Sequence, residues 1–496
     1  MIGDGARPRR FAAISAIVCV ALTAAILVVI LGFVDAEKAS PQASEPPEEQ
    51  TMVREGRIAS DRPDWVYEPF EVPEGVTEIS VRYEYNREGG NALDIGVFDP
   101  DGYELGNEEG FRGWSGGARS EFTISRSGAT PGYVPGEIES GIWNIIFGPY
   151  QVGPQRIDWK ATITLRYGDP GPAFEPNPAP EEANGRGPSW YRGDLHLHTV
   201  HSDGTYTPEE LVAGADAAGL DFVVSSEHNT PTANSIWGDH ARSNLLILNG
   251  EEITTRAGHY NAIGLEPEQW MDWRYRPEDG QLGRFLDEIH AEGGLAVVNH
   301  PFCPFKGCDW RFGYEGMDAI EVWNGPWTPD DEASVTLWDG LLREGRTILV
   351  AGGASDAHRP GQTIGLPQTV VRADGLSRDG ILAGVRAGRS YVTESSNVTL
   401  GMTAATEDGL RAGLGERIAS GPGTPVTVSL RVQGAAGSSA TFHTEDGVVK
   451  AAPIPDGDET VTYTTRARNT EYVRAEVRKP GGAMAAFTNP IFVGRK

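Results

Sequence analysis

The chain has 496 residues, 39% hydrophobic and 23% charged, a composition that excludes a wholly disordered, collagen-like or multi-span membrane protein. At roughly 100–200 residues per domain, this length predicts about three globular domains. Its 70 acidic and 42 basic side chains leave a formal net charge of −28, so the surface repels phosphate backbones and no nucleic-acid polymer is expected as a partner.

The N-terminal residues 1–36 predict a membrane segment. An uncharged apolar run over residues 11–34 follows three arginines within residues 7–10. At about 1.5 Å per residue this run is about 36 Å long, which spans a bilayer core, and the arginines favour a cytoplasmic N-terminus. We therefore expect a membrane-anchored protein, held in the membrane by this helix, whose other domains lie outside the cytoplasm. The alternative is secretion after cleavage of a signal peptide near Ala36.

Two β-rich regions flank a central region of different pattern. Apolar and polar residues alternate over Ile79–Tyr85 and over Val426–Val432, which predicts antiparallel strands and an all-β sandwich in each region. Pro-rich segments with few apolar residues predict solvated linkers. The expected boundaries are 1–36 for the membrane anchor or signal segment, 37–58 for a linker, 59–168 for the N-terminal β-sandwich, 169–188 for a Pro-rich linker, 189–397 for the central domain and 398–496 for the C-terminal β-sandwich.

Short apolar runs alternate with helical patterns in the central region, which predicts βα units with parallel strands. Thr207, Pro208 and Glu210 form the start signal of a helix that Gly219 can end. The same region holds nine of the ten histidines of the chain. An α/β fold is therefore expected here, and the chemistry of the protein is expected to lie in it.

Polar side chains follow the apolar runs of this region. The carboxyl ends of parallel strands in a barrel meet on one face, so these side chains are expected to lie together. Two histidines of a His-x-His strand point to the same side, and imidazoles with carboxylates suit zinc, manganese or iron. A single such histidine would have an ordinary structural role, but the whole set predicts a metal cluster. The segments are Asp194–His198, Glu227–Asn229, Gly250–Glu252, Asn299–His300, Trp323–Asn324 and Ser355–His358.

These motifs, together with Gly258–His259, resemble the polymerase and histidinol phosphatase (PHP) domain superfamily and, within it, the CehA/McbA-type metallohydrolases. The resemblance covers about residues 190–395 and implies a distorted (β/α)7 TIM-like barrel with two or three divalent transition metal ions. The family includes phosphatases, phosphodiesterases, nucleases and, in that branch, a carbamate-ester hydrolase. The expected fold is therefore a multidomain chain in which an α/β PHP barrel lies between two all-β sandwiches, after an N-terminal transmembrane helix.

The resemblance also implies the metal ligands and the catalytic residues. Two residues depart from the family pattern, since Glu227 stands where relatives usually have Asp and Asp203 stands where some relatives have His. Glu252, Asp356 and His358 are the implied catalytic residues. The implied ligands are His196, His198 and Asp356 for one ion, Glu252 as the bridge to a second ion held by His259 and His300, and Asp203, His228 and His358 for a third.

Candidate substrate contacts lie near these ligands in the sequence. The cations Lys306, Arg311 and Arg359 are candidates to hold a substrate anion, although a solvated surface position is the alternative for each. The amides Asn229 and Asn324, at the ends of apolar runs, are further candidates. A leaving group would take its proton from His358, His201 or a metal-bound water.

Cys303 and Cys308 flank a short Pro-Phe-Lys-Gly loop directly after His300-Pro301. Two cysteines at this spacing in an exported protein are expected to form a disulfide. Metal ligation and free thiols are the alternatives.

The combined pattern predicts a metal-dependent hydrolase. Two nearby divalent ions lower the pKa of a bridging water from about 15.7 towards about 7 and so supply hydroxide at neutral pH. The preferred function is a phosphoesterase, a phosphatase or phosphodiesterase, that acts on a small phosphorylated molecule outside the cytoplasm. The alternatives are a carboxyl-ester, carbamate-ester or amide hydrolase of the CehA/McbA type, and a non-catalytic surface protein that binds metal. The sequence predicts no particular oligomeric state.

Overall fold

The structure is a computed structural model that describes residues 48–345 and 352–495. The expected membrane segment, residues 11–34, and most of the expected linker before Glu48 lie outside the described residues. Within the described ranges, no helix is both long enough and apolar enough to cross a membrane. By their contacts, residues 47–496 belong to a single compact unit.

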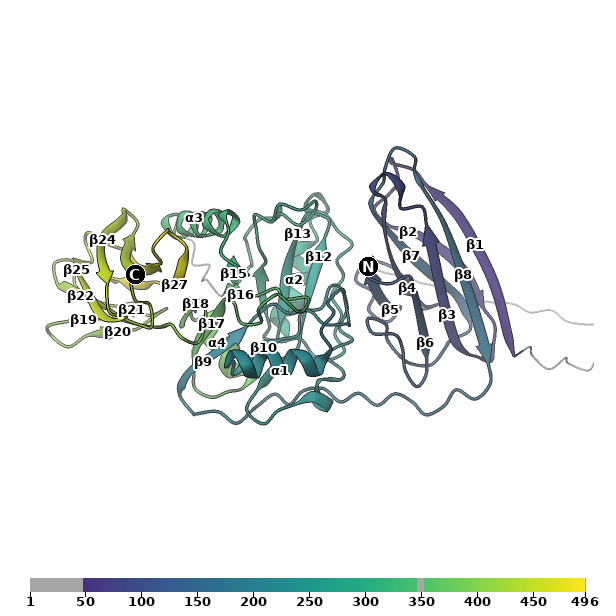
Figure 1. Cartoon of the computed structure of the whole chain (residues 1–496), viewed down its shortest axis with the longest axis horizontal. Coiled ribbons are helices and arrows are strands. Elements are labelled where there is room, and N and C mark those ends of the chain that lie inside the picture. Colours follow the sequence, from purple (N-terminus) through teal and green to yellow (C-terminus); the bar gives the residue numbers. More distant parts are fainter. Residues whose placement is uncertain (1–47, 346–351, 496) are drawn as a thin grey trace, which may run out of the picture. The chain divides into compact units, whose positions relative to one another are not determined.

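The N-terminal region forms the expected β-sandwich from two antiparallel four-stranded sheets (Figure 1). One sheet has the order β1-β8-β3-β6 and the other has the order β2-β7-β4-β5. Alternation along β3 buries Ile79, Val81 and Tyr83 in the core between the sheets, which is why the pattern of period two identified this strand. The strands are β1 (Glu49–Ile58), β2 (Val66–Val72), β3 (Val76–Tyr85), β4 (Ala92–Phe98), β5 (Phe111–Gly116), β6 (Glu121–Ser125), β7 (Gly141–Gln151) and β8 (Ile157–Tyr167).

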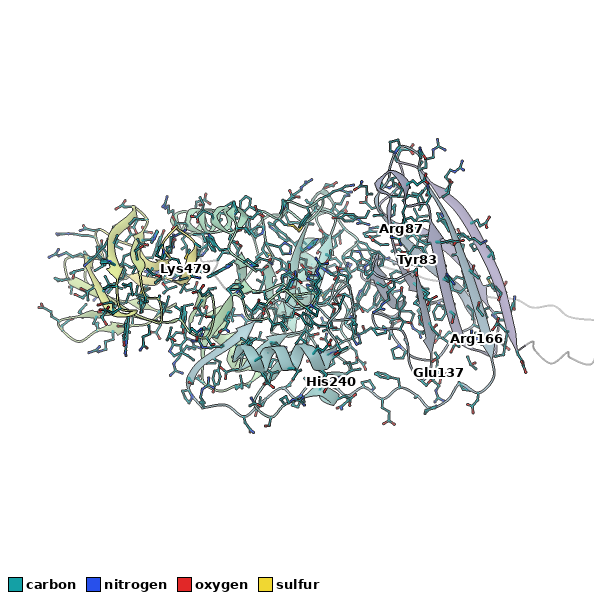
Figure 2. The ribbon with its side chains drawn as sticks, viewed as in Figure 1. Tyr83, Arg87, Glu137, Arg166, His240 and Lys479 are labelled. Atoms are coloured by element: carbon teal, nitrogen blue, oxygen red, sulfur yellow. A yellow bond between two sulfur atoms is a disulfide. The ribbon has the colours of Figure 1, made fainter. Side chains whose placement is uncertain are left out.

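The first strand lies inside the segment that was expected to be a linker over residues 37–58. β1 pairs with β8 along its whole length, from Glu49 opposite Arg166 to Ile58 opposite Ile157. Arg166, which is labelled in Figure 2, donates a hydrogen bond to Glu49 and contacts Glu78 of β3 across the sheet. β1 is an edge strand and exposes most of its side chains, so its composition is polar. This composition resembles that of a solvated linker, although the backbone of β1 is paired.

The central region alternates strands with four α-helices. Helix α1 begins at a capping box formed by Thr207 and Glu210 and ends at Gly219 in the left-handed conformation, as the sequence predicts. The elements are β9 (Ser189–Asp194), α1 (Pro208–Ala218), β10 (Phe222–Val224), β11 (Leu246–Leu248), β12 (Gly250–Thr255), β13 (Gly258–Ile263), α2 (Leu282–Ala291), β14 (Leu295–Val298), β15 (Ala319–Asn324), α3 (Pro329–Arg343), β16 (Gly352–Ala354), β17 (Gln368–Ala373), α4 (Arg378–Arg386) and β18 (Ser390–Thr393).

The hydrogen-bond ladders of this region form two sheets in the described residues, so a closed seven-stranded barrel is not confirmed. β9, β10 and β11 are parallel in one sheet, and β14, β15 and β16 are parallel in the other. The hairpin β12–β13 and the pair β17–β18 are antiparallel, which a ring of βα units does not contain. The apolar run at residues 348–351, which precedes Ser355–His358 in the sequence, lies outside the described residues.

Two isolated bridges join these sheets at their carboxyl ends. Leu197, after β9, bridges to Ala357, after β16, and His228, after β10, bridges to Glu252 in β12. The ends of strands from both sheets therefore meet at one place, as the sequence analysis predicted for the side chains that follow the apolar runs.

The C-terminal region forms a second β-sandwich, but one of its sheets continues into the central region. β27 pairs with β18, with Thr488 opposite Tyr391, so a ladder crosses the expected boundary at residue 398. The other sheet, β20-β19-β22-β25, buries the alternating valines and leucine of β22. The strands are β19 (Thr399–Thr406), β20 (Arg411–Ala412), β21 (Arg417–Ile418), β22 (Pro425–Gln433), β23 (Ser438–Thr444), β24 (Gly447–Ile454), β25 (Asp458–Arg466), β26 (Tyr472–Arg478), β27 (Met484–Thr488) and β28 (Ile491–Val493).

Candidate metal centre

The strand ends bring all nine predicted ligands into one cluster. Three of the four non-glycine residues with positive φ in the described chain lie at this cluster: Asn229 (55°), His300 (25°) and Asp356 (49°). Such backbone is costly and is retained where the surrounding structure holds it, most often at functional sites. By element, His196 and His198 follow β9, Asp203 precedes α1, His228 follows β10, Glu252 lies in β12, His259 lies in β13, His300 follows β14, and Asp356 and His358 follow β16.

The first predicted ion position is surrounded by two imidazoles and two carboxylates. His196 Nε2 and His198 Nε2 lie 3.3 and 3.1 Å from Asp356 Oδ1, and 3.3 and 3.5 Å from Glu252 Oε2. Both Nε2 atoms and Glu252 Oε2 are buried and have no hydrogen-bond partner among the described residues. Buried polar atoms are almost always satisfied, so atoms that converge in this way fit the ligands of a cation.

The second position lies on the other oxygen of Glu252. Glu252 Oε1 is 3.2 Å from His259 Nδ1 and 3.3 Å from His300 Nε2, and His259 Nδ1 is again buried without a hydrogen-bond partner in the described chain. The two oxygens of this fully buried carboxylate therefore face different sets of imidazoles, which is the geometry of a bridging ligand.

The third position is more open to solvent. Asp203 Oδ1 lies 3.4 Å from His228 Nε2 and 3.3 Å from His358 Nε2. With His198, these residues offer ligand atoms within 4.8 Å of one another. The Asp203 side chain is 48% exposed, whereas that of Glu252 is fully buried.

Two predicted ligands, His198 and Glu252, have protonation states that suit metal binding, whereas burial is outweighed by neighbouring carboxylates, which raise the pKa of His196, His228, His300 and His358. Burial lowers the pKa of His198 to about 3, assisted by His358 and His228, so the imidazole is neutral and has a free lone pair. Burial opposes ionisation of Glu252, but His228 and His196 outweigh it and hold the pKa of this carboxyl well below its usual value. Glu252 is therefore an anion, as a metal ligand must be.

Glu321 supports the cluster and was not among the predicted residues. Its Oε2 lies 3.3 Å from His196 Nδ1 and accepts a hydrogen bond from the backbone N–H of His300, while its Oε1 accepts one from Asn324. This contact fixes the ring of His196, whose other nitrogen faces Glu252. The available signal was a charged residue inside the apolar run Ala319–Val322, because an acidic side chain in a buried strand needs a partner.

Glu227, the departure from the family pattern, braces the loop that carries the ligands. Its carboxylate accepts hydrogen bonds from the backbone N–H of Thr199 at 2.9 Å and from Ser202 Oγ at 2.5 Å. Ser202 Oγ lies 3.5 Å from His198 Nδ1, so Glu227 is linked to this histidine through a hydroxyl.

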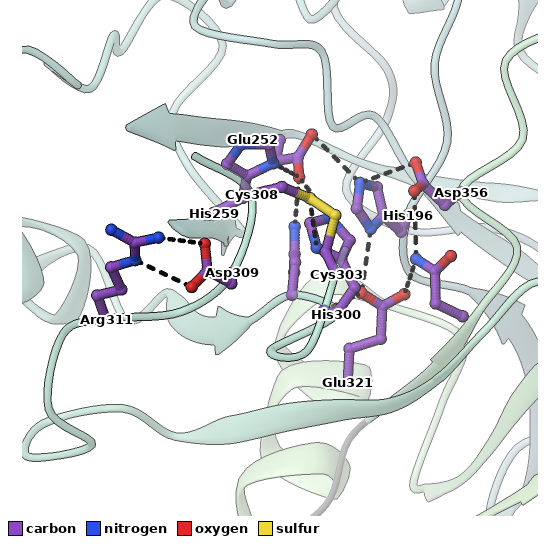
Figure 3. The surroundings of a disulfide bond; sticks show 12 residues. His196, Glu252, His259, His300, Cys303, Cys308, Asp309, Arg311, Glu321 and Asp356 are labelled. Atoms are coloured by element: carbon purple, nitrogen blue, oxygen red, sulfur yellow. Dashed lines mark hydrogen bonds and ion pairs between the residues drawn. A yellow bond between two sulfur atoms is a disulfide. The ribbon is translucent and has the colours of Figure 1, made fainter. Parts of the chain in front are cut away.

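The three predicted substrate cations do not enter the site. Lys306 donates its ammonium to the carbonyl of Tyr150, Arg311 pairs with Asp309 apart from the histidine cluster (Figure 3), and Arg359 is exposed. None of the three lines the cavity at the cluster, so nearness to a ligand in sequence did not place these cations in its wall.

The remaining predicted contacts differ from one another. Asn324 lines the site and donates to Asp356 Oδ2 at 3.2 Å. Asn229 is buried and accepts from the N–H of Thr254 at 2.7 Å, so its role is structural. His201 contacts Thr232 and lines a different pocket, which removes it as a proton donor for this site.

Cys303 and Cys308 form a disulfide with a Cα–Cα distance of 5.5 Å. It lies beside the cluster, with Cys308 Sγ 3.5 Å from His300 Nδ1 (Figure 3). The two sulfur atoms are therefore bonded to each other and are not free as thiolate ligands.

A cavity of about 770 Å³ opens onto the cluster. Its wall includes Glu252, His259, His300 and Asp356. None of the described residues that line it is a lysine or arginine.

No protein-family model matches the chain. The chain is 26% identical over 146 residues to the uncharacterized protein MJ1587 of Methanocaldococcus jannaschii, a match that covers 27% of this chain and 81% of the relative. A two-domain protein from Bacteroides vulgatus that contains a predicted PHP-like metal-dependent phosphoesterase is 20% identical, with a TM-score of 0.35, over 64% of this chain and all of that chain. An amidohydrolase from Chromobacterium violaceum, solved with sulfate and no metal, is 20% identical, with a TM-score of 0.26, over 35% of this chain and 89% of that chain. At such values these remain similarities alone, and the CehA/McbA resemblance stays a prediction.

Proposed function

We propose that this protein is a metal-dependent hydrolase that holds two or three zinc, manganese or iron ions around Glu252. The observation that carries the proposal is the set of buried, unbonded nitrogen and oxygen atoms that face the two oxygens of Glu252. A cluster of this kind has no structural use without a cation, because each unsatisfied buried polar atom costs about 1–3 kcal/mol.

Divalent ions held here would activate water for attack and offset the charge that develops on an ester oxygen. Hydrolysis adds the hydroxyl of water to the reacting centre, breaks its bond to the leaving-group oxygen and delivers one proton to that oxygen. His358 lines the cavity, and in the two-ion form, with the third position vacant, it is proposed to deliver that proton. Asn324 would orient Asp356 and the substrate.

The preferred substrate is a small phosphate ester. The cavity volume fits a small molecule, and the acidic surface of the chain slows the approach of a polyanion. The absence of lysine and arginine from the described wall favours a second candidate, hydrolysis of a carboxyl ester, carbamate ester or amide, because such substrates need no cation beyond the ions.

One experiment separates these functions. The chain is purified without chelators, and phosphate or phenol release is measured on phosphomonoesters, phosphodiesters and carboxyl esters, with Glu252→Gln as the inactive control. Turnover of phosphate esters alone supports the phosphoesterase, and turnover of carboxyl esters alone supports the second candidate. Bound metal with no turnover across the panel would favour a non-catalytic metal-binding protein.

We also propose that the protein acts outside the cytoplasm, either membrane-anchored or secreted after cleavage near Ala36. The Cys303–Cys308 disulfide supports this location, since such bonds persist in oxidising compartments. Immunoblots of membrane, soluble and secreted fractions test it. A full-length product in the cytoplasm with both thiols reduced would contradict it.

A further inference from the structure

The rim of the metal-site cavity carries an exposed aromatic ring. Phe305 is 75% exposed, the highest value among the exposed large apolar side chains of the described residues. It lines the cavity of about 770 Å³ together with groups that are also apolar: Pro304, Pro326, Leu366 and the Cys303–Cys308 disulfide. An exposed apolar rim above a polar floor is typical of a ligand site.

The position of this ring is set by the loop that carries it. The disulfide joins the residues two before and three after Phe305, and the N–H of Cys303 donates to the carbonyl of His300 at 2.9 Å. The N–H of Cys308 donates to the carbonyl of Phe305 at 3.3 Å. Phe305 is therefore exposed on a loop that a disulfide and two backbone hydrogen bonds hold in place, directly after the predicted metal ligand His300.

The charges on the cavity wall restrict the substrate further. The described wall contains Asp330 and Asp331 beside the predicted ligands and contains no lysine or arginine, and the carboxylate of Asp331 accepts hydrogen bonds from the N–H groups of Asn324 and Thr328. A substrate with several negative charges would meet repulsion that only the bound ions could offset. The reacting group is therefore expected to carry at most one negative charge.

We propose that Phe305 forms a subsite for an apolar ring of the substrate, so that the preferred substrate is an ester with a ring-sized apolar group and at most one negative charge at its reacting centre. This inference rests on the proposed hydrolase function, because it places the ester at the ions and its ring against Phe305. Phe305 contacts the substrate and sets specificity without taking part in bond cleavage.

The same loop supplies a matched control. Phe302 is 43% exposed and lines a neighbouring groove, but it does not line the metal-site cavity. Phe302→Ala and Phe305→Ala remove the same ring from the same loop, and only the second change alters the cavity. Both variants are expected to keep the metal content and melting temperature of the wild type.

The first test measures binding without turnover. Isothermal titration of the metal-loaded chain compares methyl phenylphosphonate with methyl methylphosphonate, two monoanions that differ by the ring alone. An aromatic contact of this kind is worth about 0.5–1.5 kcal/mol, so the wild type and Phe302→Ala should bind the phenyl compound about three- to tenfold more tightly. Phe305→Ala should lose this preference. Equal affinities in the wild type, or an unchanged preference in Phe305→Ala, would overturn the proposal.

The second test measures methanol release from a phenyl diester, methyl phenyl phosphate, and from a methyl diester, dimethyl phosphate, so that only the first substrate carries a ring. Phe305→Ala should raise KM for the phenyl diester about three- to tenfold with kcat nearly unchanged, and it should leave the methyl diester unaffected. Hydrolysis of both diesters with no ring preference would support the proposed hydrolase function and contradict the proposed Phe305 subsite. A ring preference in binding with no hydrolysis of any ester would support the proposed Phe305 subsite and contradict the proposed hydrolase function.

Discussion

At the scale of single residues, Glu252 gives the site its two-sided geometry. It is fully buried, and its oxygens face separate sets of imidazoles at 3.2–3.5 Å, apart from His228, which is closer. The sequence could identify such ligands because each follows or lies in an apolar strand. It marked Glu321 only as a charged residue within an apolar run, and it gave no signal for Phe305, whose role depends on side chains from other segments.

Glu321 is a positioning residue, and its removal should weaken metal binding without unfolding the protein. Glu321→Gln replaces the carboxylate that holds His196 Nδ1 and is expected to lower metal affinity about 10–100-fold. Competition with a fluorescent chelator measures this affinity. Asp309→Asn, which alters a carboxylate paired with Arg311 outside the cluster, should leave it unchanged. Equal affinities for Glu321→Gln and the wild type would refute the role.

At the scale of elements, the disulfide loop and the strand ends have separate tasks. The loop after β14 carries the Cys303–Cys308 bond, while the ligands come from strand ends. Replacing both cysteines by alanine should lower the free energy of unfolding by about 2 kcal/mol, as expected for so short a closed loop. The metal content should not change, because the sulfur atoms are not ligands. Urea unfolding and metal analysis measure the two effects, and loss of an ion would show that a thiol binds metal.

Helix α3 is joined to strand β26 by a buried ion network. Arg474, 2% exposed, lies 2.8 Å from Asp339 of α3 and 2.7 Å from Glu476. Arg474→Met removes the cation shared by two buried carboxylates, which keep only Arg343 and Arg478 as arginine partners among the described residues, and should cost about 3 kcal/mol of stability. The exposed pair of Arg431 and Asp458 is the control, since Arg431→Met should cost less than about 1 kcal/mol. Similar melting temperatures for the two variants would contradict the network's importance.

The same network predicts an acid-dependent loss of stability. Burial raises the pKa of Glu476, but Arg474, His443 and Arg478 outweigh it and lower the pKa to about 2 from a usual value of 4.5. A carboxyl whose folded-state pKa is lowered stabilises the fold above its unfolded pKa, and this contribution is lost as pH falls from about 4.5 to about 2. In chemical denaturation across this window, Glu476→Gln should lose less stability than the wild type. Parallel losses would show that Glu476 does not contribute.

At the scale of the whole molecule, the central and C-terminal regions share a sheet. Because β18 pairs with β27, a chain that ends at residue 397 would expose the buried, unpaired edge of β18 and would also leave Asp339 without Arg474. We expect this fragment to aggregate, whereas the described full unit stays soluble. Size-exclusion chromatography of both proteins tests this, and a monomeric fragment that binds metal would contradict it.

The sequence predicted local features better than long-range ones. The caps of α1 and the alternating strands were found because their signals lie within a few residues. The edge strand β1 was predicted as part of a linker over 37–58. The sheet shared through β18 and β27 joins segments far apart in the sequence and has no local signal. The sequence predicted only parallel βα units in the central region, but the structure contains an antiparallel hairpin, β12–β13. The strand ends still converge as predicted.

Metal content tests the central claim most directly. Inductively coupled plasma mass spectrometry of the chain, purified without chelators, should find at least two zinc, manganese or iron ions per chain. Glu252→Gln, folded by circular dichroism, should lose at least one of them, because both oxygens of this carboxylate face ligand sets. Fewer than two ions in the wild type, or an unchanged content in Glu252→Gln, would contradict the account.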